Sequence, residues 1–338
     1  MIAAFFGSFA GNIVLFIVGL LLLIKGGDWF VDGATGIAER FHVPELLIGA
    51  TVVSIGTTLP EVMVSASSAA QGLGDMAYGN AIGSIICNTA LVAALTIAIK
   101  PSKVERKSLF VPVAFFFAAA AIYVVIAYSS QYFSRTVGII LLLIFAAYMI
   151  LNIRDAVKGS TIVSKQADTA EESESEDDKK VKPMWLDILL LVVGAALITL
   201  GANLLIDNGT AIASYLGVPN SVIALTFVAL GTSLPELVTA ITSLAKGHGA
   251  LSLGNIIGAN LFNLVLVSGL SITIAPFSIP AGKTIGGINA SLVMDMPIML
   301  AVMLIMTVPT LLRGKLSRVQ GILLLAIYAG FCAFQFVM

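Results

Sequence analysis

Charged residues are scarce in this sequence. They make up 11% of its 338 residues, against about 25% in a typical soluble domain. Hydrophobic residues make up 58%, and the mean hydropathy is +1.02. So few charges cannot cover the surface of a soluble globule, and the composition therefore predicts an integral membrane protein. The net charge of −1 gives no electrostatic reason to expect a nucleic-acid partner.

Cysteine and histidine are equally rare, with two of each. Cys87 and Cys332 lie in apolar runs and are expected to be small buried side chains, not a disulfide or a redox pair. The N-terminus has no basic residues before its first apolar run, so we expect no cleaved signal peptide. No motif indicates an enzyme, a bound cofactor or an obligatory protein partner.

Long apolar runs are what the sequence has in abundance. A helix needs roughly 20 apolar residues to span a bilayer. We therefore expect an all-α membrane protein with ten transmembrane helices, at about 11–34, 43–71, 77–99, 109–129, 135–153, 185–207, 218–245, 250–275, 287–309 and 318–337.

The one long polar stretch, 154–184, is expected to be a solvated, disordered linker, because it is highly charged and has no aromatic residues. Most of the 18 Lys and Arg residues fall in loops on the same side of the predicted membrane as this linker. The positive-inside rule then predicts a cytoplasmic linker and two outer termini. We expect a multi-pass protein of the cell (inner) membrane.

One pattern occurs twice, at an offset of 175 residues. GTTLPE at 56–61 recurs as GTSLPE at 231–236, and GNAIGS at 79–84 recurs as GNIIGA at 254–259. Two membrane segments share Leu and Ala by chance, but not Gly, Asn, Pro and Glu in register. Each copy holds five predicted spans, so the second copy enters the membrane from the other side.

The sequence therefore predicts two inverted five-helix repeats, 1–153 and 185–338, joined by the linker 154–184. Inverted repeats are typical of secondary transporters, whose substrate site lies at the repeat interface near the middle of the bilayer.

Two glutamates are predicted to lie near that middle plane. Glu61 and Glu236 each precede the polar end of a span by ten residues, or about 15 Å of helix in a core about 30 Å thick. A carboxylate at that depth needs a counter-charge, a proton or a bound cation. Lys25 is the only basic residue well inside a span, and Asp28 and Asp32 of its own helix are expected to pair with it. A bound cation is the simplest remaining partner.

Residues that can supply oxygen ligands lie close to the two glutamates in the sequence. Thr57 and Thr232 lie four residues earlier, on the same helical face. Pro60 and Pro235 lack a backbone N–H, so freed carbonyls and unwound backbone are expected in both copies. A cage made only of oxygen suits a hard cation such as Ca²⁺, and no His or Cys ligands nearby suggest zinc. Further polar candidates on the third and eighth spans are Ser84, Asn88 and Asn263.

Glycines line the same two spans. Gly79 and Gly83, and in the other copy Gly254 and Gly258, form faces of small residues spaced four apart. Such faces allow two helices to approach closely. We expect them to pack against the second and seventh spans, which carry the glutamates.

The two motif pairs resemble a known family. GTTLPE with GNAIGS, and GTSLPE with GNIIGANLFN, are similar to the two alpha-repeats of the calcium/cation antiporter superfamily, most closely its prokaryotic sodium/calcium exchanger branch. The span count and the central hydrophilic loop also match. The resemblance implies alternating binding of Ca²⁺ and Na⁺, with spans one and six sliding past the rest. The ion-binding residues it implies are Glu61, Glu236, Thr57, Thr232, Thr58, Ser233, Ser84, Asn88, Asn263 and the carbonyls of Ser54 and Ala229.

The sequence departs from the family pattern at three positions. Ala259 stands where the family usually has a serine ligand for Na⁺, Ile85 where an asparagine is usual, and Asn263 where many relatives carry aspartate. These changes remove a hydroxyl oxygen and a titratable group from the site. Ca²⁺ binding at the two glutamates is therefore better supported than any particular number of Na⁺ ions.

Three functions remain open at this point. The first is an antiporter that exchanges Ca²⁺ for Na⁺ and exports calcium from the cytoplasm. The second is an antiporter coupled to H⁺ or K⁺; with H⁺ the two glutamates would alternate between protonated and Ca²⁺-bound forms. The third, from a different class, is a passive cation channel, which inverted repeats and a tight cage at mid-depth disfavour.

Overall fold

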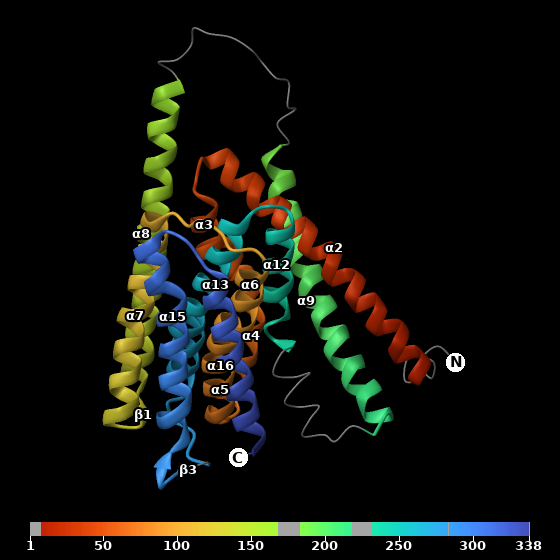
Figure 1. Ribbon diagram of the computed structural model, residues 1–338, viewed down its shortest axis with the longest axis vertical. Helices are drawn as coiled ribbons and strands as arrows, with labels where there is room; N and C mark the ends of the chain where they lie inside the picture. The colour runs from red at the N-terminus through yellow and green to blue at the C-terminus, as the bar shows by residue number, and fades with distance from the viewer. Residues whose placement is uncertain (1–7, 168–182, 218–230, 283, 338) are drawn as a thin grey trace.

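The computed structural model describes residues 8–167, 183–217, 231–282 and 284–337, and shows a bundle of long helices (Figure 1). In lipid every backbone polar group must be satisfied internally, and the helix achieves this within one segment. The first half contains α2 (Phe9–Phe41), α3 (Glu45–Ile48), the π-helix η1 (Gly49–Val53), α4 (Ser54–Ala70), α5 (Gly74–Cys87), the π-helix η2 (Asn88–Ala93), α6 (Ala94–Ile99), α7 (Arg106–Ser129) and α8 (Arg135–Ala167).

The second half repeats much of this order. It contains α9 (Met184–Tyr215), α12 (Leu234–Ala245), α13 (Gly249–Phe262), the π-helix η4 (Asn263–Val267), α14 (Ser268–Ile274), the π-helix η5 (Ser291–Asp295), α15 (Met296–Arg313) and α16 (Arg318–Val337).

The β-structure in the part of the chain that the structure describes consists of very short strands and one isolated antiparallel bridge between Lys103 and Lys315. β1 (Tyr132–Phe133) pairs antiparallel with β2 (Phe277–Ser278), and β3 (Thr284–Ile285) pairs antiparallel with β4 (Ile288–Asn289). Labels β1 and β3 lie at the end of the bundle opposite the linker (Figure 1). The prediction of an all-α membrane protein is confirmed for the membrane-crossing part.

Nine helical spans among the described residues are long and apolar enough to cross a membrane. They correspond to nine of the ten predicted spans. The predicted span 218–245 is covered only by α12, because 218–230 lies outside the described residues. The predicted disorder of 154–184 is wrong for its first part, since α8 continues to Ala167; residues 168–182 lie outside the described ranges.

Helices α2 and α9 are unusually long and lie side by side, inclined to the other helices (Figure 1). Their 33 and 32 residues span about 50 Å, more than the hydrocarbon core, and such helices tilt. Glycines allow their backbones to touch. A Cβ atom on Gly26 would lie 2.9 Å from the carbonyl oxygen of Gly194, and one on Gly194 would lie 2.8 Å from that of Gly26.

The centre of the bundle is formed by two spans that are equivalent in the repeat. The span Gly74–Ile99 is 72% buried and the span Gly249–Ile274 is 83% buried, more than any other span. A Cβ atom on Gly258 would lie 2.6 Å from Cα of Ala50. The predicted close packing of Gly254 and Gly258 against the second span is therefore confirmed. An added Cβ on Gly79 or Gly83 meets no described atom within 4 Å.

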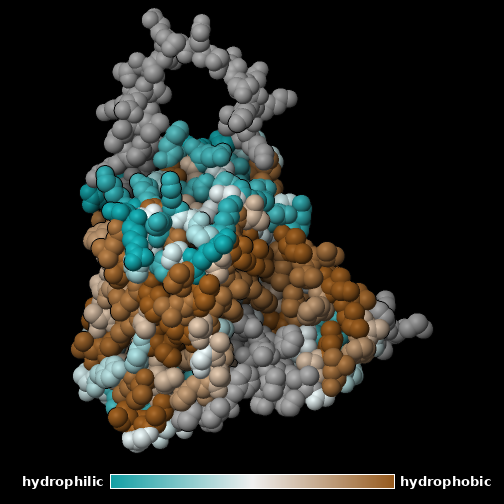
Figure 2. All heavy atoms as spheres, in the orientation of Figure 1, coloured by the Kyte–Doolittle hydropathy of each residue, from teal (hydrophilic) through white to brown (hydrophobic). Residues whose placement is uncertain are grey.

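Polar side chains gather at one end of the molecule. Figure 2 shows them above a broad apolar band, at the end where α8 stops and α9 begins. We call this the linker end; α2 begins and α16 ends at the opposite end (Figure 1). Exposed basic side chains at or near the start of α7 and the end of α15 include Lys103, Arg106, Lys107, Arg313 and Lys315. The apolar band is the part of the surface suited to lipid.

Candidate cation site

The two glutamates of the repeated hexapeptide meet in the interior of the bundle. Glu61 of α4 and Glu236 of α12 are both 0% exposed, and their carboxyl groups are close enough to interact electrostatically. The hydroxyl groups of Thr57 and Thr58 lie beside Glu236. No described residue makes a hydrogen bond of good geometry to any of the four carboxyl oxygens. A buried carboxylate without donors is costly, so this pair of oxygen ligands is suited to a cation.

The backbones that carry the two glutamates differ. α4 runs without a break through Pro60, so the predicted unwinding of the first copy is wrong. A helix can keep its course through proline when only one N–H is lost, here the usual partner of the Gly56 carbonyl. In the second copy Thr232 and Ser233 form a turn, and Pro235 lies in the first turn of α12. Unwound backbone is confirmed there.

Two asparagines mark π-helices at equivalent positions of the repeat. Asn88 is the first residue of η2 and Asn263 is the first residue of η4. Both side chains are 0% exposed, and their amide N and O atoms have no hydrogen-bond partner among the described residues. A π-helix leaves a local irregularity in the backbone bonding and occurs often at functional sites. The amide oxygens are free to ligate a cation.

The other predicted site residues fall into three groups. Thr58 and Ser233 are buried, and their hydroxyl groups make no hydrogen bond of good geometry in the described part of the chain. Ser84 is buried one turn before Asn88, and Thr232 is half-buried in the turn before α12. Ala229 lies outside the described residues. Ser233 is close to Cys87, the neighbour of Asn88, so the turn of the second copy approaches the π-helix of the first.

Ser54 is held by its side chain. The Ser54 hydroxyl lies 2.7 Å from the carbonyl oxygen of Gly49 and 2.9 Å from that of Asn255, and so ties α4 to α13. The resemblance assigned the Ser54 carbonyl to an ion site. Among side chains, the Thr57 hydroxyl approaches that carbonyl at a long 3.5 Å, and a carbonyl oxygen has two lone pairs, so one acceptor position remains beside its helical bond.

Asn80 and Asn255 are site residues that the sequence reasoning missed. The side-chain Oδ1 of Asn255 accepts a hydrogen bond from the Thr57 hydroxyl at 3.1 Å. The side-chain amide of Asn80 donates to the main-chain oxygen of Glu61 at 3.2 Å and to the Ser65 hydroxyl at 2.8 Å. The two asparagines occupy the same place in the repeated Gly-Asn-x-Ile-Gly motif. That repetition was the signal that could have identified them.

The ligand set is chemically uniform. Among the described residues no group of three or more His, Cys, Asp or Glu side chains could hold a metal ion. The site is therefore built from two carboxylates and neutral hydroxyl, amide and carbonyl oxygens. Ca²⁺ prefers such hard oxygen ligands, and two carboxylates balance its charge. Fold and site together define a polytopic membrane protein with a buried cluster of oxygen atoms that is a candidate site for hard cations.

The chain belongs to the sodium/calcium exchanger family. The family model described as "Sodium/calcium exchanger protein" matches residues 11–154 and 186–337. The chain is thus a transporter of the cation/Ca²⁺ exchanger type and not an enzyme. An uncharacterized membrane protein of Methanocaldococcus jannaschii is 35% identical, over 93% of this chain and 94% of its own length. The sodium/calcium exchanger MaX1 of Methanosarcina acetivorans is 29% identical, over 96% and 98%.

Solved structures agree with this assignment. The sodium-calcium exchanger NCX_Mj, soaked with Na⁺ and without Ca²⁺, matches with a TM-score of 0.75 and 32% identity, over 96% of this chain and 99% of its own. The same exchanger soaked with Na⁺ and Sr²⁺ matches with a TM-score of 0.76 and 31% identity, over the same shares. The expected family resemblance is therefore confirmed.

Proposed function

We propose that this protein is an antiporter that exchanges Ca²⁺ for Na⁺ across the membrane by alternating access. Its two halves, 1–153 and 185–338, act as inverted five-helix repeats, and ten helices cross the membrane when the segment 218–245 is included. Glu61 and Glu236 hold Ca²⁺ at the repeat interface. Oxygens of Thr57, Thr58, Thr232, Ser233, Ser84, Asn88, Asn263, Ser54 and Ala229 complete the Ca²⁺ and Na⁺ sites.

The observation that carries this proposal is the pair of buried carboxylates that lack hydrogen bonds of good geometry. Both side chains are 0% exposed, and neither has a hydrogen-bond partner of good geometry among the described residues. Two negative charges at close range in a medium of low dielectric repel strongly. One divalent cation, or several monovalent ones, removes that repulsion, so occupancy by either ion makes the other unnecessary. This reciprocal requirement is the basis of exchange.

The orientation of the protein in the membrane follows from the distribution of charge, and the sodium gradient then sets the direction of transport. Most of the exposed basic residues lie at the linker end, whereas Arg135 is exposed at the opposite end; by the positive-inside rule the linker end then faces the cytoplasm. The termini then lie outside. A relative in Escherichia coli, 36% identical over 78% of this chain, is named inner membrane protein YrbG. In this orientation an inward sodium gradient drives calcium out of the cell.

The test is calcium flux into proteoliposomes with gradients of Na⁺, K⁺ and H⁺ imposed one at a time. The proposal expects flux with a sodium gradient at clamped pH. Glu61→Gln and Glu236→Gln should each abolish it, while Glu39→Gln, a neutralisation at an exposed position of α2, should leave it unchanged.

Other outcomes have distinct meanings. Flux driven only by a proton gradient would replace sodium coupling by proton coupling, and flux driven only by potassium would do the same for K⁺. Currents far above the turnover of a carrier would point to a channel. Wild-type flux in Glu61→Gln or Glu236→Gln would refute the assignment of the site.

A further inference from the structure

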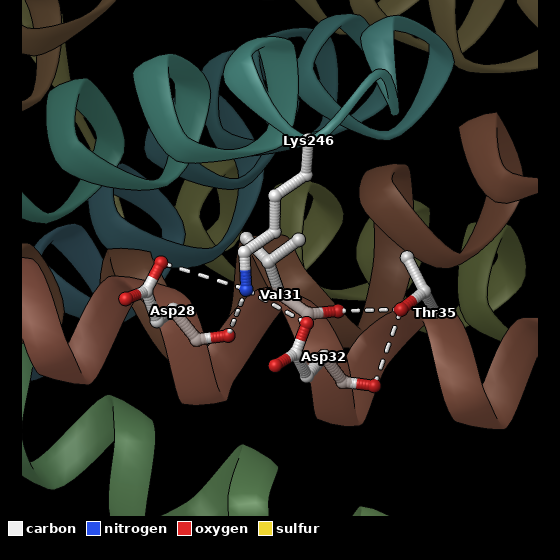
Figure 3. A network of polar contacts seen from close by, with 5 residues as sticks. All are labelled: Asp28, Val31, Asp32, Thr35 and Lys246. Carbon is white, nitrogen blue, oxygen red and sulfur yellow. Dashed lines mark hydrogen bonds and ion pairs between the residues drawn. The ribbon is translucent and has the colours of Figure 1, made fainter.

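Lys246 joins two parts of the molecule at the linker end. It follows α12, and its ammonium group reaches α2 (Figure 3). The Lys246 Nζ lies 2.7 Å from Oδ1 of Asp32 and 3.5 Å from Oδ1 of Asp28, and it donates to the main-chain oxygen of Asp28 at 2.9 Å. Three oxygens of one helix thus surround one amine from another element.

Asp28 and Asp32 do not form ion pairs with the residue that the sequence suggested. Lys25 was expected to pair with Asp28 and Asp32 inside its own helix. Instead, its ammonium lies 5.5 Å from the centre of the Trp29 ring, and both aspartates face Lys246 (Figure 3). The prediction of an intrahelical pair is wrong. The two acids belong to a contact between α2 and the end of α12.

Tight packing continues from this contact along α12. A Cβ atom on Gly27 of α2 would lie 2.7 Å from Cγ1 of Val238 and 3.0 Å from the hydroxyl of Thr242. Val238, Thr242 and Lys246 are spaced four apart, so they lie on one face of the helix. α2 is therefore pressed onto this face, and Lys246 holds the end of the interface.

The equivalent interface in the other copy of the repeat is loose. Lys246 corresponds to Gln71, whose amide donates to the Ser67 hydroxyl of its own helix at 3.1 Å. Asn203 and Asp207 of α9, the counterparts of Asp28 and Asp32, are exposed, and no hydrogen bond between described residues joins them to Gln71.

A hollow separates the two helices in this second copy. It lies between α4 and α9 and has a volume of about 920 Å³. Its lining includes Met63, the counterpart of Val238, and Asn203. The α2–α12 interface is thus closed and has a charged contact at its end. The equivalent α4–α9 interface is open and lacks such a contact.

We propose that Lys246 is a latch that holds α2 against α12 and favours the state in which the linker end of the cation site is closed. The inference rests on the proposed function in one respect. Alternating access requires the α2–α12 interface to open while the equivalent α4–α9 interface closes. The exchange breaks the contact of Lys246 and brings Gln71 toward Asn203 and Asp207. An ion pair with two carboxylates is then replaced by a neutral amide next to one carboxylate, so the two states differ in free energy.

The contact made by Lys246 is weak enough to break in every transport cycle. The side chains of Lys246, Asp28 and Asp32 are 28%, 40% and 45% exposed, so solvent screens the charges and the contact is modest. We expect it to change the ratio of the two states by about fivefold, which corresponds to about 1 kcal/mol. A contact of this size biases a two-state equilibrium and still opens in every transport cycle.

The experiment measures the two states directly by spin-label distances. Labels on cysteines at Leu73, after α4, and Leu216, after α9, report on the loose interface; both positions are exposed. Cys87 and Cys332 are replaced in the background, and calcium is saturating. Lys246→Gln should raise the ratio of closed to open α4–α9 distances by about fivefold. Gln71→Lys should shift the distribution in the same direction, because the new lysine can pair with Asp207.

Two control variants distinguish a specific effect of the Lys246 contact from a general effect of positive charge at the linker end. Lys246→Arg keeps the positive charge and should keep the wild-type distribution. Lys107→Gln removes an exposed charge at the same end and should also leave the distribution unchanged. The latch is refuted if Lys246→Gln or Gln71→Lys retains the wild-type ratio, or if Lys107→Gln shifts it equally. A sodium gradient that drives no calcium flux in the wild type would refute the proposed coupling, while an intact shift would still support the latch.

Discussion

The hydroxyl of Thr57 donates a hydrogen bond to Oδ1 of Asn255 at 3.1 Å, although the two residues lie 198 positions apart. This bond joins the glutamate helix of one copy to the central helix of the other. Both side chains are buried, at 2% and 0% exposure. The position of a proposed ion ligand therefore depends on a residue that has no charge and that we do not assign as a ligand.

Asn255→Ala should weaken cation binding. The substitution removes the acceptor that orients Thr57, and loss of such a buried bond costs about 1–2 kcal/mol, or about 5- to 30-fold in affinity. Isothermal titration with Ca²⁺ in detergent measures the effect. Asn152→Ala is the matched control, because among the described residues this buried asparagine donates to the carbonyl of Tyr148 in its own helix. Equal affinities in the two variants would contradict the role given to Asn255.

Calcium should stabilise the folded protein through the two glutamates. At a concentration 100 times the dissociation constant, a ligand that binds only the folded state adds about 2.7 kcal/mol. We expect the apparent Tm in detergent to rise with added Ca²⁺ and to fall on chelation. Glu236→Gln should lose this dependence, whereas Glu39→Gln should keep it. A calcium-dependent Tm in Glu236→Gln would show that the ion binds elsewhere.

Gly258→Ala should destabilise the bundle. The added Cβ would collide with the backbone of Ala50 and with the side chain of Ser54, and overpacking of this kind costs about 1–3 kcal/mol. Gly83→Ala changes the equivalent residue of the other copy, where the Cβ meets no described atom within 4 Å. Thermal unfolding followed by size-exclusion chromatography should show a lower Tm for Gly258→Ala than for Gly83→Ala. The reverse order would contradict the packing seen between α13 and the second span.

Removing either member of the ion pair between α2 and α9 should destabilise the protein, but by different amounts. Arg40 is 27% exposed and Asp187 only 5%, and their charged groups lie 3.3 Å apart. Arg40→Ala leaves a buried carboxylate without its charge partner and should cost up to about 3 kcal/mol. Asp187→Ala leaves an arginine that water can reach, and it should cost less.

Apparent Tm values of the two single variants test this order. Arg154→Ala, a change at an exposed position of α8, should have no measurable effect on stability. A larger decrease in Tm for Asp187→Ala than for Arg40→Ala would contradict this order. It would show that the unpaired arginine is more costly than the unpaired aspartate.

Much of the architecture could be predicted from the sequence, because lipid imposes a simple rule on it. A segment that crosses the membrane must be apolar and helical, so run length alone located nine of the spans that the structure describes. The repeated hexapeptide was equally informative. Glu61 and Glu236 stand out because a carboxylate in an apolar run is rare and costly.

The errors came from local reasoning about backbone and charge. Proline predicted unwinding at residues 56–61, but α4 continues through Pro60, since surrounding packing can support a helix that has lost one bond. Spacing along one helix predicted that Lys25 pairs with Asp28. In the structure a different helix supplies the cation, from Lys246, and no spacing within α2 could reveal that partner.

By itself, the sequence determined that this is a membrane protein of long helices with a duplicated acidic motif, because hydropathy and repetition are properties of the order of residues. Tertiary structure alone decided that Asn255 orients Thr57 and that Lys246 holds Asp28 and Asp32. It also decided that the two repeated halves pack differently around the same site. These relationships join residues about 200 positions apart, and their energies depend on distance and burial, which arise only when the helices are packed.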